Sequence, residues 1–356
     1  MIDILQGAYQ SKKVLVTGSF GFKGSWLNYF LTRLNARVFG YSLYPDSSPL
    51  HFNLLHLGIN SVEGNINNLQ NFRNYLDEHK PEIVFHLAAQ SLVRYSYQNP
   101  VETYQTNVMG TVNILEACRL QPSVKAIIVV TSDKCYENLE SGRAYTETDP
   151  MGGFDPYSSS KGSAELVVSS YRNSFFNLDD FGYKHHVLVA SARAGNVIGG
   201  GDWSTDRLIP DIIKAAVVKK EVIIRNPQSV RPWQHVLDPV YGYLLLGAKL
   251  LAGDKIFATA WNFGPRHNEV MTVQEVLDRA CSLWNDVKYK IEKDEKMHEA
   301  QLLMLDCSKA NEVLKWHPVW NTEQAIHHTI NWYREYYLQN RIITELDFDS
   351  YLKVLS

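Results

Sequence analysis

The chain has 356 residues, of which 45% are hydrophobic and 21% charged, a composition typical of a globular protein with one large or two smaller domains. Its formal net charge of −3 gives no electrostatic reason to expect nucleic acid or an anionic membrane as a partner. The first residues lack the basic-then-apolar order of a signal peptide, and no apolar run is long enough to span a bilayer, so we expect a cytoplasmic protein. The four cysteines are widely separated in the sequence, which predicts neither a metal site nor a disulfide framework.

The first predicted elements are a buried strand over residues 14–17, a glycine-rich loop, and a helix from about residue 25 to residue 34. In this order Gly18 permits a tight turn, Gly21 lets the backbone approach a pyrophosphate, and Gly24 lets the helix pack closely on the sheet. A glycine-rich loop without a ligand is the alternative, but the flanking strand and helix favour a dinucleotide. The spacing is Gly-x-x-Gly-x-x-Gly rather than the Gly-x-Gly-x-x-Gly of simple dehydrogenases.

The end of the second predicted strand, residues 38–42, indicates which dinucleotide is bound. An acidic residue usually follows this strand and holds the ribose hydroxyls. Here Ser42 stands in that place and Asp46 comes late. No arginine is present there to pair with a 2′-phosphate, so we expect NAD rather than NADP.

Strands and helices continue to alternate along the first half of the chain, which predicts a doubly wound parallel sheet. We expect a Rossmann-type domain over residues 1–194 and a smaller substrate-binding lobe over residues 195–356, with the chain crossing between them. Further strands are predicted at residues 62–66, 83–89, 126–130 and 187–190, and helices at 69–79, 100–119 and from 156 onward.

The stretch from Thr131 to Lys161 carries the predicted chemistry. It follows a buried strand, and Asp155 with Pro156 is a helix-start signal. Tyr157 and Lys161 then lie four apart on one helical face, where an ammonium favours the phenolate and brings the pKa of the tyrosine closer to neutral. Such a spacing alone arises by chance in many helices, and the rest of the chain makes it significant.

Past residue 194 the sequence changes character, with a glycine-rich loop followed by a helix over residues 207–220. Arg225, Arg231 and His235 then fall in a short span beside aromatic residues. Clustered arginines next to aromatic rings suit a diphosphate and a flat base, although a solvated basic face is an equal alternative. Further helices are predicted at residues 272–284, opened by a capping box, and at 306–316 and 322–337, whose aromatic residues are expected in the core.

Together these residues resemble the extended short-chain dehydrogenase/reductase family over nearly the whole chain. The resemblance rests on the Gly18–Gly21–Gly24 loop, on His86-Leu87-Ala88-Ala89, Asn107, Tyr157 with Lys161, Arg193-Ala194-Gly195-Asn196-Val197 and Asp306-Cys307-Ser308-Lys309-Ala310. Within that family the chain is similar to the CDP-glucose 4,6-dehydratases. Their marks are residues 21–26 (GFKGSW), 131–138 (TSDKCYEN), 149–153 (DPMGG), 199–203 (GGGDW) and 231–236 (RPWQHV).

Three positions depart from the pattern of related dehydratases. Lys134 stands where the dTDP-glucose and GDP-mannose enzymes carry a glutamate base, as in the CDP-sugar branch. Asn65 stands where the family usually has an aspartate that contacts adenine; its amide oxygen still accepts from the adenine amine, so weaker binding is expected. Ser19-Phe20 replaces a histidine and a small residue, a change without an assigned consequence.

The resemblance implies an NAD-dependent reaction without net redox change, in which CDP-D-glucose becomes CDP-4-keto-6-deoxyglucose during O-antigen deoxysugar biosynthesis. Tyr157 removes the C4 hydroxyl proton as hydride leaves C4, while Lys161 lowers its pKa and Ser132 bonds the same oxygen. Lys134, or a neighbour, then takes the C5 proton, and Asp133 protonates the departing C6 hydroxyl before hydride returns to C6. Lys134 must be neutral to act as a base, for which burial beside Lys161 is needed; alternatively it orders a water or the substrate oxygens.

The predicted site residues fall into three groups. The catalytic group is Ser132, Asp133, Lys134, Tyr157 and Lys161. The cofactor group is Gly18, Phe20, Gly21, Phe22, Gly24, Asn65, Ile66, Leu87, Ala88, Ala89, Asn107, Tyr157 and Lys161. The substrate group is Gln90, Asn196, Arg207, Leu208, Arg225, Arg231 and His235.

Two other functions fit the same fold. A nucleotide-sugar 4-epimerase, or another 4,6-dehydratase of the family, uses the same tyrosine and lysine, but an epimerase needs no acid and base for elimination, which Asp133 and Lys134 supply. A dinucleotide-sensing regulator without activity usually loses the tyrosine or the lysine, and this chain keeps both. The family resemblance also implies a homo-oligomer, a dimer or tetramer, formed through helices near residues 100–119 and 157–176.

Overall fold

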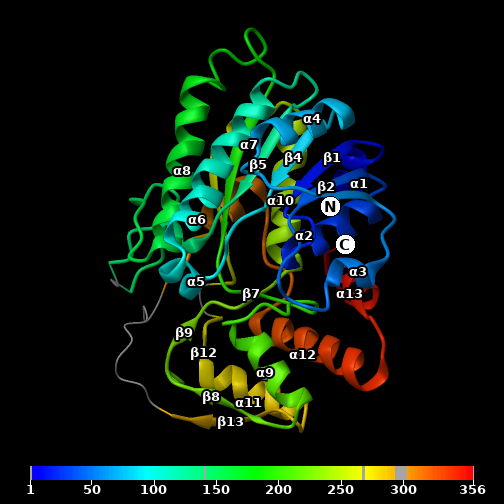
Figure 1. Cartoon of the computed structure of the whole chain (residues 1–356), viewed down its shortest axis with the longest axis vertical. Helices are drawn as coiled ribbons and strands as arrows, with labels where there is room; N and C mark the ends of the chain where they lie inside the picture. Colours follow the sequence, from blue (N-terminus) through cyan, green and yellow to red (C-terminus); the bar gives the residue numbers. More distant parts are fainter. Residues whose placement is uncertain (1, 140–141, 267–268, 293–302, 356) are drawn as a thin grey trace.

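The computed structural model describes residues 2–139, 142–266, 269–292 and 303–355, which form a sheet-centred body and a smaller lobe beneath it in Figure 1. The described strands of the body make one parallel sheet in the order β11–β6–β5–β4–β1–β2–β3. The doubly wound parallel sheet predicted from the sequence is therefore confirmed. Its strands are β1 (Lys13–Thr17), β2 (Arg37–Ser42), β3 (Asn60–Glu63), β4 (Ile83–His86), β5 (Ala126–Val130), β6 (Leu188–Ala194) and β11 (Ala260–Phe263).

The central strands are buried on both faces, which explains their continuous apolar sequences. All five residues of β5 are buried. Ile128 packs in one apolar cluster with helices α1, α2 and α10, whereas Ile127 and Val129 pack in another with α4, α7 and α8. Side chains alternate between the two sides of a strand, so the sheet is the middle of three layers (Figure 1).

The helices of the body are α1 (Ile2–Tyr9), α2 (Phe22–Arg33), α3 (His51–Leu55), α4 (Leu69–His79), α5 (Val93–Gln98), α6 (Pro100–Tyr104), α7 (Gly110–Arg119), α8 (Pro156–Ser174), α10 (Leu237–Leu251) and α13 (Thr344–Leu355). The helix predicted over residues 100–119 is divided by a π-helical turn at Gln105–Met109. Helix α8 begins where the sequence indicates, because the Asp155 carboxylate accepts a hydrogen bond from the Ser158 amide at 2.9 Å.

The lobe contains α9 (Leu208–Val217), α11 (Val273–Leu283) and α12 (Thr322–Gln339) around its own apolar cluster. Trp332 and Tyr333 are fully buried there, as expected from the sequence. The helix predicted over residues 306–316 is shorter, with a π-helical turn at Ala310–Leu314. Short strand pairs complete the lobe: β7 (Val197–Ile198) with β10 (Gln234–His235), β8 (Glu221–Ile224) with β13 (Lys288–Ile291), and β9 (Val230–Arg231) with β12 (Met271–Thr272).

The chain passes between body and lobe more than once after residue 194. Helix α10 and strand β11 return to the body, where β11 extends the sheet beside β6. Helix α13 returns again and packs on α2, with Phe348 against Phe30 and Arg33 bonded to Glu345 and Asp349. The second half of the chain therefore supplies part of the dinucleotide-binding fold. Among the described residues, no helix is both long and apolar enough to cross a bilayer.

Candidate active site

Predicted catalytic and cofactor residues follow the carboxyl ends of β1, β4 and β5, which are neighbours in the sheet. Gly18 follows β1, Ala88 follows β4, and Ser132 follows β5. Between β1 and β4 the strand order reverses, and ligands of open α/β sheets bind in the crevice at such a reversal.

The glycine loop has the geometry that a dinucleotide pyrophosphate requires. Gly18 has a φ of +72°, and a Cβ there would lie 2.7 Å from the Ala88 amide nitrogen. A Cβ on Gly24 would overlap the Gly18 carbonyl oxygen, so loop, helix and β4 pack without side chains between them. Gly21 is the N-cap of α2 and offers no side-chain cap. The amides of the first turn are therefore available to an anion, and the loop fits the cofactor predicted for it.

Lys23 is a site residue that the sequence analysis did not assign. It lies in the first turn of α2, and burial together with the charges of Arg207 and Lys161 lowers its pKa to about 8, against an opposing effect of Asp133. The charges of two cations, Arg207 and Lys161, thus reach a third, Lys23, where Asp133 and Asp202 oppose them, and Arg207 is paired with Asp202 at 2.9 Å. This excess of positive charge suits a phosphate-bearing ligand. The signal in the sequence that could have identified Lys23 is its position between Gly21 and Gly24 in the glycine loop.

Tyr157 and Lys161 lie on the same face of α8, and both are buried. The Lys161 Nζ atom is 6.0 Å from the centre of the Tyr157 ring. Burial raises the pKa of Tyr157 to about 12, although a hydrogen bond with Ser132 and the charge of Arg207 act in the opposite direction. Burial also lowers the pKa of Lys161 to about 8. The predicted shift of the Tyr157 pKa toward neutral pH is therefore wrong, because the effect of burial outweighs the Ser132 hydrogen bond and the charge of Arg207.

The residues after β5 form a tight turn rather than a continued strand. Strand β5 ends at Val130, and Asp133–Cys135 is a short 3-10 helix capped by Ser132. The Ser132 hydroxyl donates to the Asp133 carboxylate at 2.9 Å. Asp133 is buried directly against Gly195, where a Cβ would collide with its carboxylate. Lys134 is only partly buried, so the burial expected to make it a base is incomplete.

Asn107 connects the turn after β4 to the start of α8. It lies in the π-helical turn, a feature often found at functional sites. Its amide nitrogen donates to the Gln90 carbonyl at 2.9 Å and to the Ser160 hydroxyl at 2.8 Å, while its oxygen accepts from the Gln90 amide at 2.9 Å. The Gln90 side chain donates to Thr103 at 2.8 Å. Asn107 thus fixes the backbone around Tyr157, and Gln90 is itself held by the protein.

The other predicted cofactor residues line the same side of the sheet. The Asn65 amide oxygen accepts from the Asn67 amide at 2.9 Å, which leaves one of its lone pairs for a ligand. Ile66 is buried against Gly110. Phe20 is buried and stacks on Tyr44, with ring centres 4.3 Å apart. Phe22, Leu87, Ala88 and Ala89 are partly exposed.

The predicted substrate residues divide into those near Tyr157 and those away from it. Arg207 is the N-cap residue of α9 and donates to Ser91 at 3.0 Å, and its charge reaches Tyr157. Leu208 follows it and is partly buried. Asn196 follows Gly195, which touches Asp133, and has a φ of +29°. Arg207 thus lies close enough to act on Tyr157, and Asn196 is next in sequence to the glycine that contacts Asp133.

The predicted cluster of Arg225, Arg231 and His235 does not form. Arg225 is exposed after the end of β8, whereas Arg231 lies on β9 and is partly buried. His235 is fully buried, packed against Trp26 and Trp320. It presents no surface to a ligand, so its assignment as a substrate contact is wrong. A turn and a change of strand separate the three residues, although they are close in sequence.

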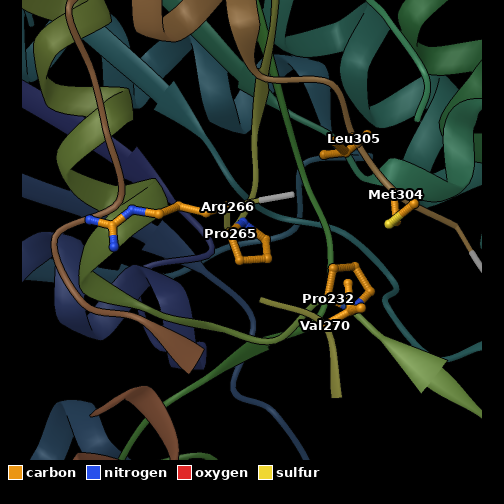
Figure 2. A pocket seen from close by; sticks show the side chains of 6 residues that line it. All are labelled: Pro232, Pro265, Arg266, Val270, Met304 and Leu305. Carbon is orange, nitrogen blue, oxygen red and sulfur yellow. The ribbon is translucent and has the colours of Figure 1, made fainter. Parts of the chain in front are cut away.

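Two adjoining small cavities lead from Asp133 into the lobe. The inner one is bordered by Asp133, Gly195 and Gln234. The outer one, shown in Figure 2, is bordered by Arg266, Val270 and Met304, and both share Pro232, Pro265 and Leu305. Each has a volume of about 10 Å³, which is room for about one water molecule. In Figure 2 the Arg266 side chain extends away from the other five.

Comparison with known proteins shows the family of the chain. A model of the GDP-mannose 4,6 dehydratase family matches residues 15–329. The chain belongs to this family. It is also 49% identical to the CDP-glucose 4,6-dehydratase of Salmonella typhimurium over 337 residues, which are 94% of this chain and 93% of that enzyme. The resemblance to the extended short-chain dehydrogenase/reductases drawn from the motifs is therefore confirmed.

Solved structures of this family share the fold. An epimerase from Methanothermobacter thermautotrophicus has a TM-score of 0.80 at 23% identity, covering 95% of this chain and 96% of that one. The dTDP-glucose 4,6-dehydratase of Bacillus anthracis, in complex with NAD, has a TM-score of 0.73 at 24% identity, covering 91% and 97%. At these identities the likeness establishes the fold of body and lobe together.

Proposed function

We propose that the protein is an NAD-dependent CDP-glucose 4,6-dehydratase that converts CDP-D-glucose to CDP-4-keto-6-deoxy-D-glucose and water, as a cytoplasmic step of deoxysugar biosynthesis for the O-antigen. The observation that carries the proposal is a double set of acid and base groups at one place. Tyr157 with Lys161 serves oxidation, and Asp133 with Lys134 serves elimination, next to a phosphate-binding loop. The 49% identity to the Salmonella enzyme supports the choice of CDP-glucose.

The cofactor assignment rests on the glycine loop and on the end of β2. The loop of Gly18 and Gly21 with the first turn of α2 holds the pyrophosphate, Lys161 holds the ribose, and Asn65 contacts the adenine, while Gly24 lets the helix pack closely on the loop. The Ser42 hydroxyl donates to the Leu43 carbonyl at 2.8 Å, and residues 43–50, which follow β2 in the sequence, include no arginine that could pair with a 2′-phosphate. When bound, NAD⁺ accepts hydride from sugar C4 and later returns it to C6.

The chain's own residues move the protons. Tyr157 takes the C4 hydroxyl proton in its phenolate form, which the Ser132 hydrogen bond and the charge of Arg207 favour against burial, and Ser132 bonds the same C4 oxygen. The 4-ketone acidifies the C5 hydrogen, which Lys134 removes. Asp133 donates a proton to the C6 oxygen, so that the C6–O bond breaks and water leaves. When hydride returns to C6, Lys134 gives its proton back to C5, which completes the 4-keto-6-deoxy sugar.

The lobe supplies the substrate contacts. Arg207 and Arg231 bind the diphosphate through charge-assisted hydrogen bonds, and Gln90, Asn196 and Leu208 border the sugar. Arg207 already has carboxylate and hydroxyl partners, in Asp202 and Ser91, which orient its guanidinium toward the site before a ligand arrives.

A homo-oligomer is supported by apolar side chains on neighbouring helices. Val101 is 78% exposed on α6, Leu166 is 61% exposed on α8, and Met109 between them in sequence is 52% exposed. Helices α6 and α8 pack against each other, and exposed apolar residues on packed helices favour association with a second copy. The same helices, residues 100–119 and 157–176, are the ones expected from the family resemblance.

The function is tested by incubating the protein with CDP-, dTDP-, UDP- and GDP-glucose and adding alkali, after which a 4-keto sugar absorbs in the near ultraviolet. We expect a signal with CDP-glucose well above the other three. An epimer or unchanged substrate gives no such absorbance, and absence of the signal with CDP-glucose would refute the proposal. Activation of cofactor-free protein by NAD⁺ and NADP⁺ tests the cofactor, because equal or better activation by NADP⁺ contradicts it.

A further inference from the structure

A buried ion pair lies directly behind the turn that runs from Thr131 to Tyr136 and carries Ser132, Asp133 and Lys134, which is called the catalytic turn below. The Arg193 guanidinium on β6 contacts the Glu165 carboxylate on α8 at 2.8 Å, and their side chains are only 4% and 2% exposed. The same carboxylate oxygen accepts from the Ser191 hydroxyl at 2.7 Å. Burial alone would raise the pKa of Glu165, but Arg193 and these hydrogen bonds keep it below its ordinary value. The pair is therefore ionised, and both terminal nitrogens of the guanidinium donate hydrogen bonds.

Each member of the pair holds one end of the catalytic turn. The Thr131 hydroxyl, at the start of the turn, donates to Glu165 Oε1 at 2.5 Å. At the other end, Arg193 donates to the Tyr136 hydroxyl at 2.6 Å, and that hydroxyl donates in turn to Asn262 at 2.7 Å. The guanidinium also lies over the Tyr136 ring, 4.9 Å from its centre. The residues between these anchors are Ser132, Asp133, Lys134 and Cys135.

Helix α8 carries both Glu165, which holds the turn at Thr131, and Tyr157, the proposed base of the oxidation step. Tyr157, Lys161 and Glu165 are spaced four apart, so they lie on one face of the helix. The helix that carries the oxidation base thus also holds the turn that carries the elimination groups. This connection fixes the distance between the two sets of groups through side chains that are buried throughout.

We infer that Glu165 and Arg193 are positioning residues, which clamp the turn at Thr131 and Tyr136 so that Asp133 and Lys134 face the same sugar as Tyr157. The inference rests on the proposed function. Elimination needs an acid near the C6 oxygen and a base near the C5 hydrogen at the same time, within hydrogen-bond reach. Displacements of about 1 Å are known to cost roughly 100-fold in rate. Because apolar residues often stabilise a core as well as a buried ion pair does, the pair is better explained by geometry than by stability.

The test removes single hydroxyl groups rather than the charges, since removal of one charge leaves the other buried and unpaired. Tyr136→Phe and Thr131→Val each release one end of the turn while keeping the shape of the side chain. Two matched controls lose an equally buried hydroxyl away from the site. Tyr9→Phe loses a bond to the Leu244 carbonyl at 2.8 Å, and Thr329→Val loses one to Ala325 at 2.7 Å.

The first measurement is amide hydrogen exchange of residues 131–138 in the full chain without substrate. Loss of one anchoring hydrogen bond should speed exchange in this segment on the order of tenfold in the two turn variants. The controls should match the wild type there. Unchanged exchange in both turn variants overturns the clamp, whatever reaction the protein catalyses.

The second measurement separates the two half-reactions with NAD⁺ and CDP-glucose. We expect the variants to reduce the nicotinamide within about twofold of the wild-type rate. Exchange of the C5 hydrogen with solvent deuterium should slow on the order of ten- to a hundredfold. An equal loss of both steps, or C5 exchange like that of the controls, overturns the positioning role. If the wild type itself does not act on CDP-glucose, the proposed function fails, and the amide exchange alone decides whether the turn is clamped.

Discussion

Two short stretches of the chain differ in whether the residues chosen from the sequence come together in the folded protein. On α8 the two residues chosen by their spacing, Tyr157 and Lys161, are buried on one face of the helix, and Glu165 lies one turn further along that face. From Arg225 to His235, residues chosen by their closeness in sequence separate. Arg225 is exposed, Arg231 lies on β9, and His235 is in the core.

The difference lies in the backbone that carries each stretch. A helix repeats every 3.6 residues, so a spacing of four determines which side chains share a face. The second stretch contains a turn and two strands of two residues each, β9 and β10, which pair with different partners. Its side-chain directions are set by those partners, which are distant in sequence.

The largest effect on turnover is expected for a substitution of Tyr157 on helix α8. Tyr157→Phe removes the hydroxyl that takes the C4 proton but keeps the ring, so packing is retained. We expect turnover to fall about 100-fold or more, in line with general-base contributions. Steady-state rates with CDP-glucose check this result, with circular dichroism as the control for folding. Turnover near the wild-type value in a folded variant contradicts the role of Tyr157.

A smaller effect, confined to one step, is expected at Lys134 in the turn after β5. Lys134→Ala should still reduce NAD⁺ when CDP-glucose binds but stall before water leaves, with C5 exchange slowed about 30- to 100-fold. Absorbance of the reduced nicotinamide and deuterium at C5 of the sugar report the two steps. Wild-type C5 exchange would assign the base to a water or another side chain. A variant that never reduces NAD⁺ would instead assign Lys134 to substrate positioning.

The stretch from Arg225 to His235 is tested with one variant at Arg231 and one at His235. Arg231→Ala should raise the KM for CDP-glucose about tenfold through loss of a charge-assisted contact. His235→Leu should instead lower the Tm, because His235 packs among aromatic rings, and should leave the KM of the folded enzyme within about twofold. An unchanged KM for Arg231→Ala removes this residue from the site, and a raised KM for His235→Leu restores it there.

The smallest effect concerns a buried carboxyl just beyond that stretch. Burial raises the pKa of Asp238 to about 7, whereas an unfolded aspartate titrates near 3.9. The folded state therefore binds a proton that the unfolded state releases between these values, and stability falls as pH rises through this range. The expected loss is about 1 kcal/mol between pH 6 and pH 7. Urea unfolding should show a correspondingly smaller loss in Asp238→Asn; identical pH dependence in both proteins contradicts the assignment.

The sequence by itself determined the elements whose signals are local. The strand–glycine loop–helix unit, the bounds of α4, the start of α8 and the pairing of Tyr157 with Lys161 all follow from periodicity, capping and spacing within about twenty residues. The apolar character of β5 was enough to predict a strand buried on both faces. Family motifs added the roles of Ser132, Asp133 and Lys134, which spacing alone does not give.

Only the tertiary structure decided the features that depend on contacts distant in sequence. Strand β11 joins the sheet because β6 lies beside it, and four residues carry too little pattern to predict that place. Lys23 enters the site because α2 begins opposite Arg207 and Asp133, and His235 leaves it because Trp26 and Trp320 close around it. The high pKa of Tyr157 likewise depends on burial, which is a sum over neighbours from many parts of the chain. A local pattern fixes the direction of a side chain on its own element, whereas burial and partners are fixed only when the elements pack.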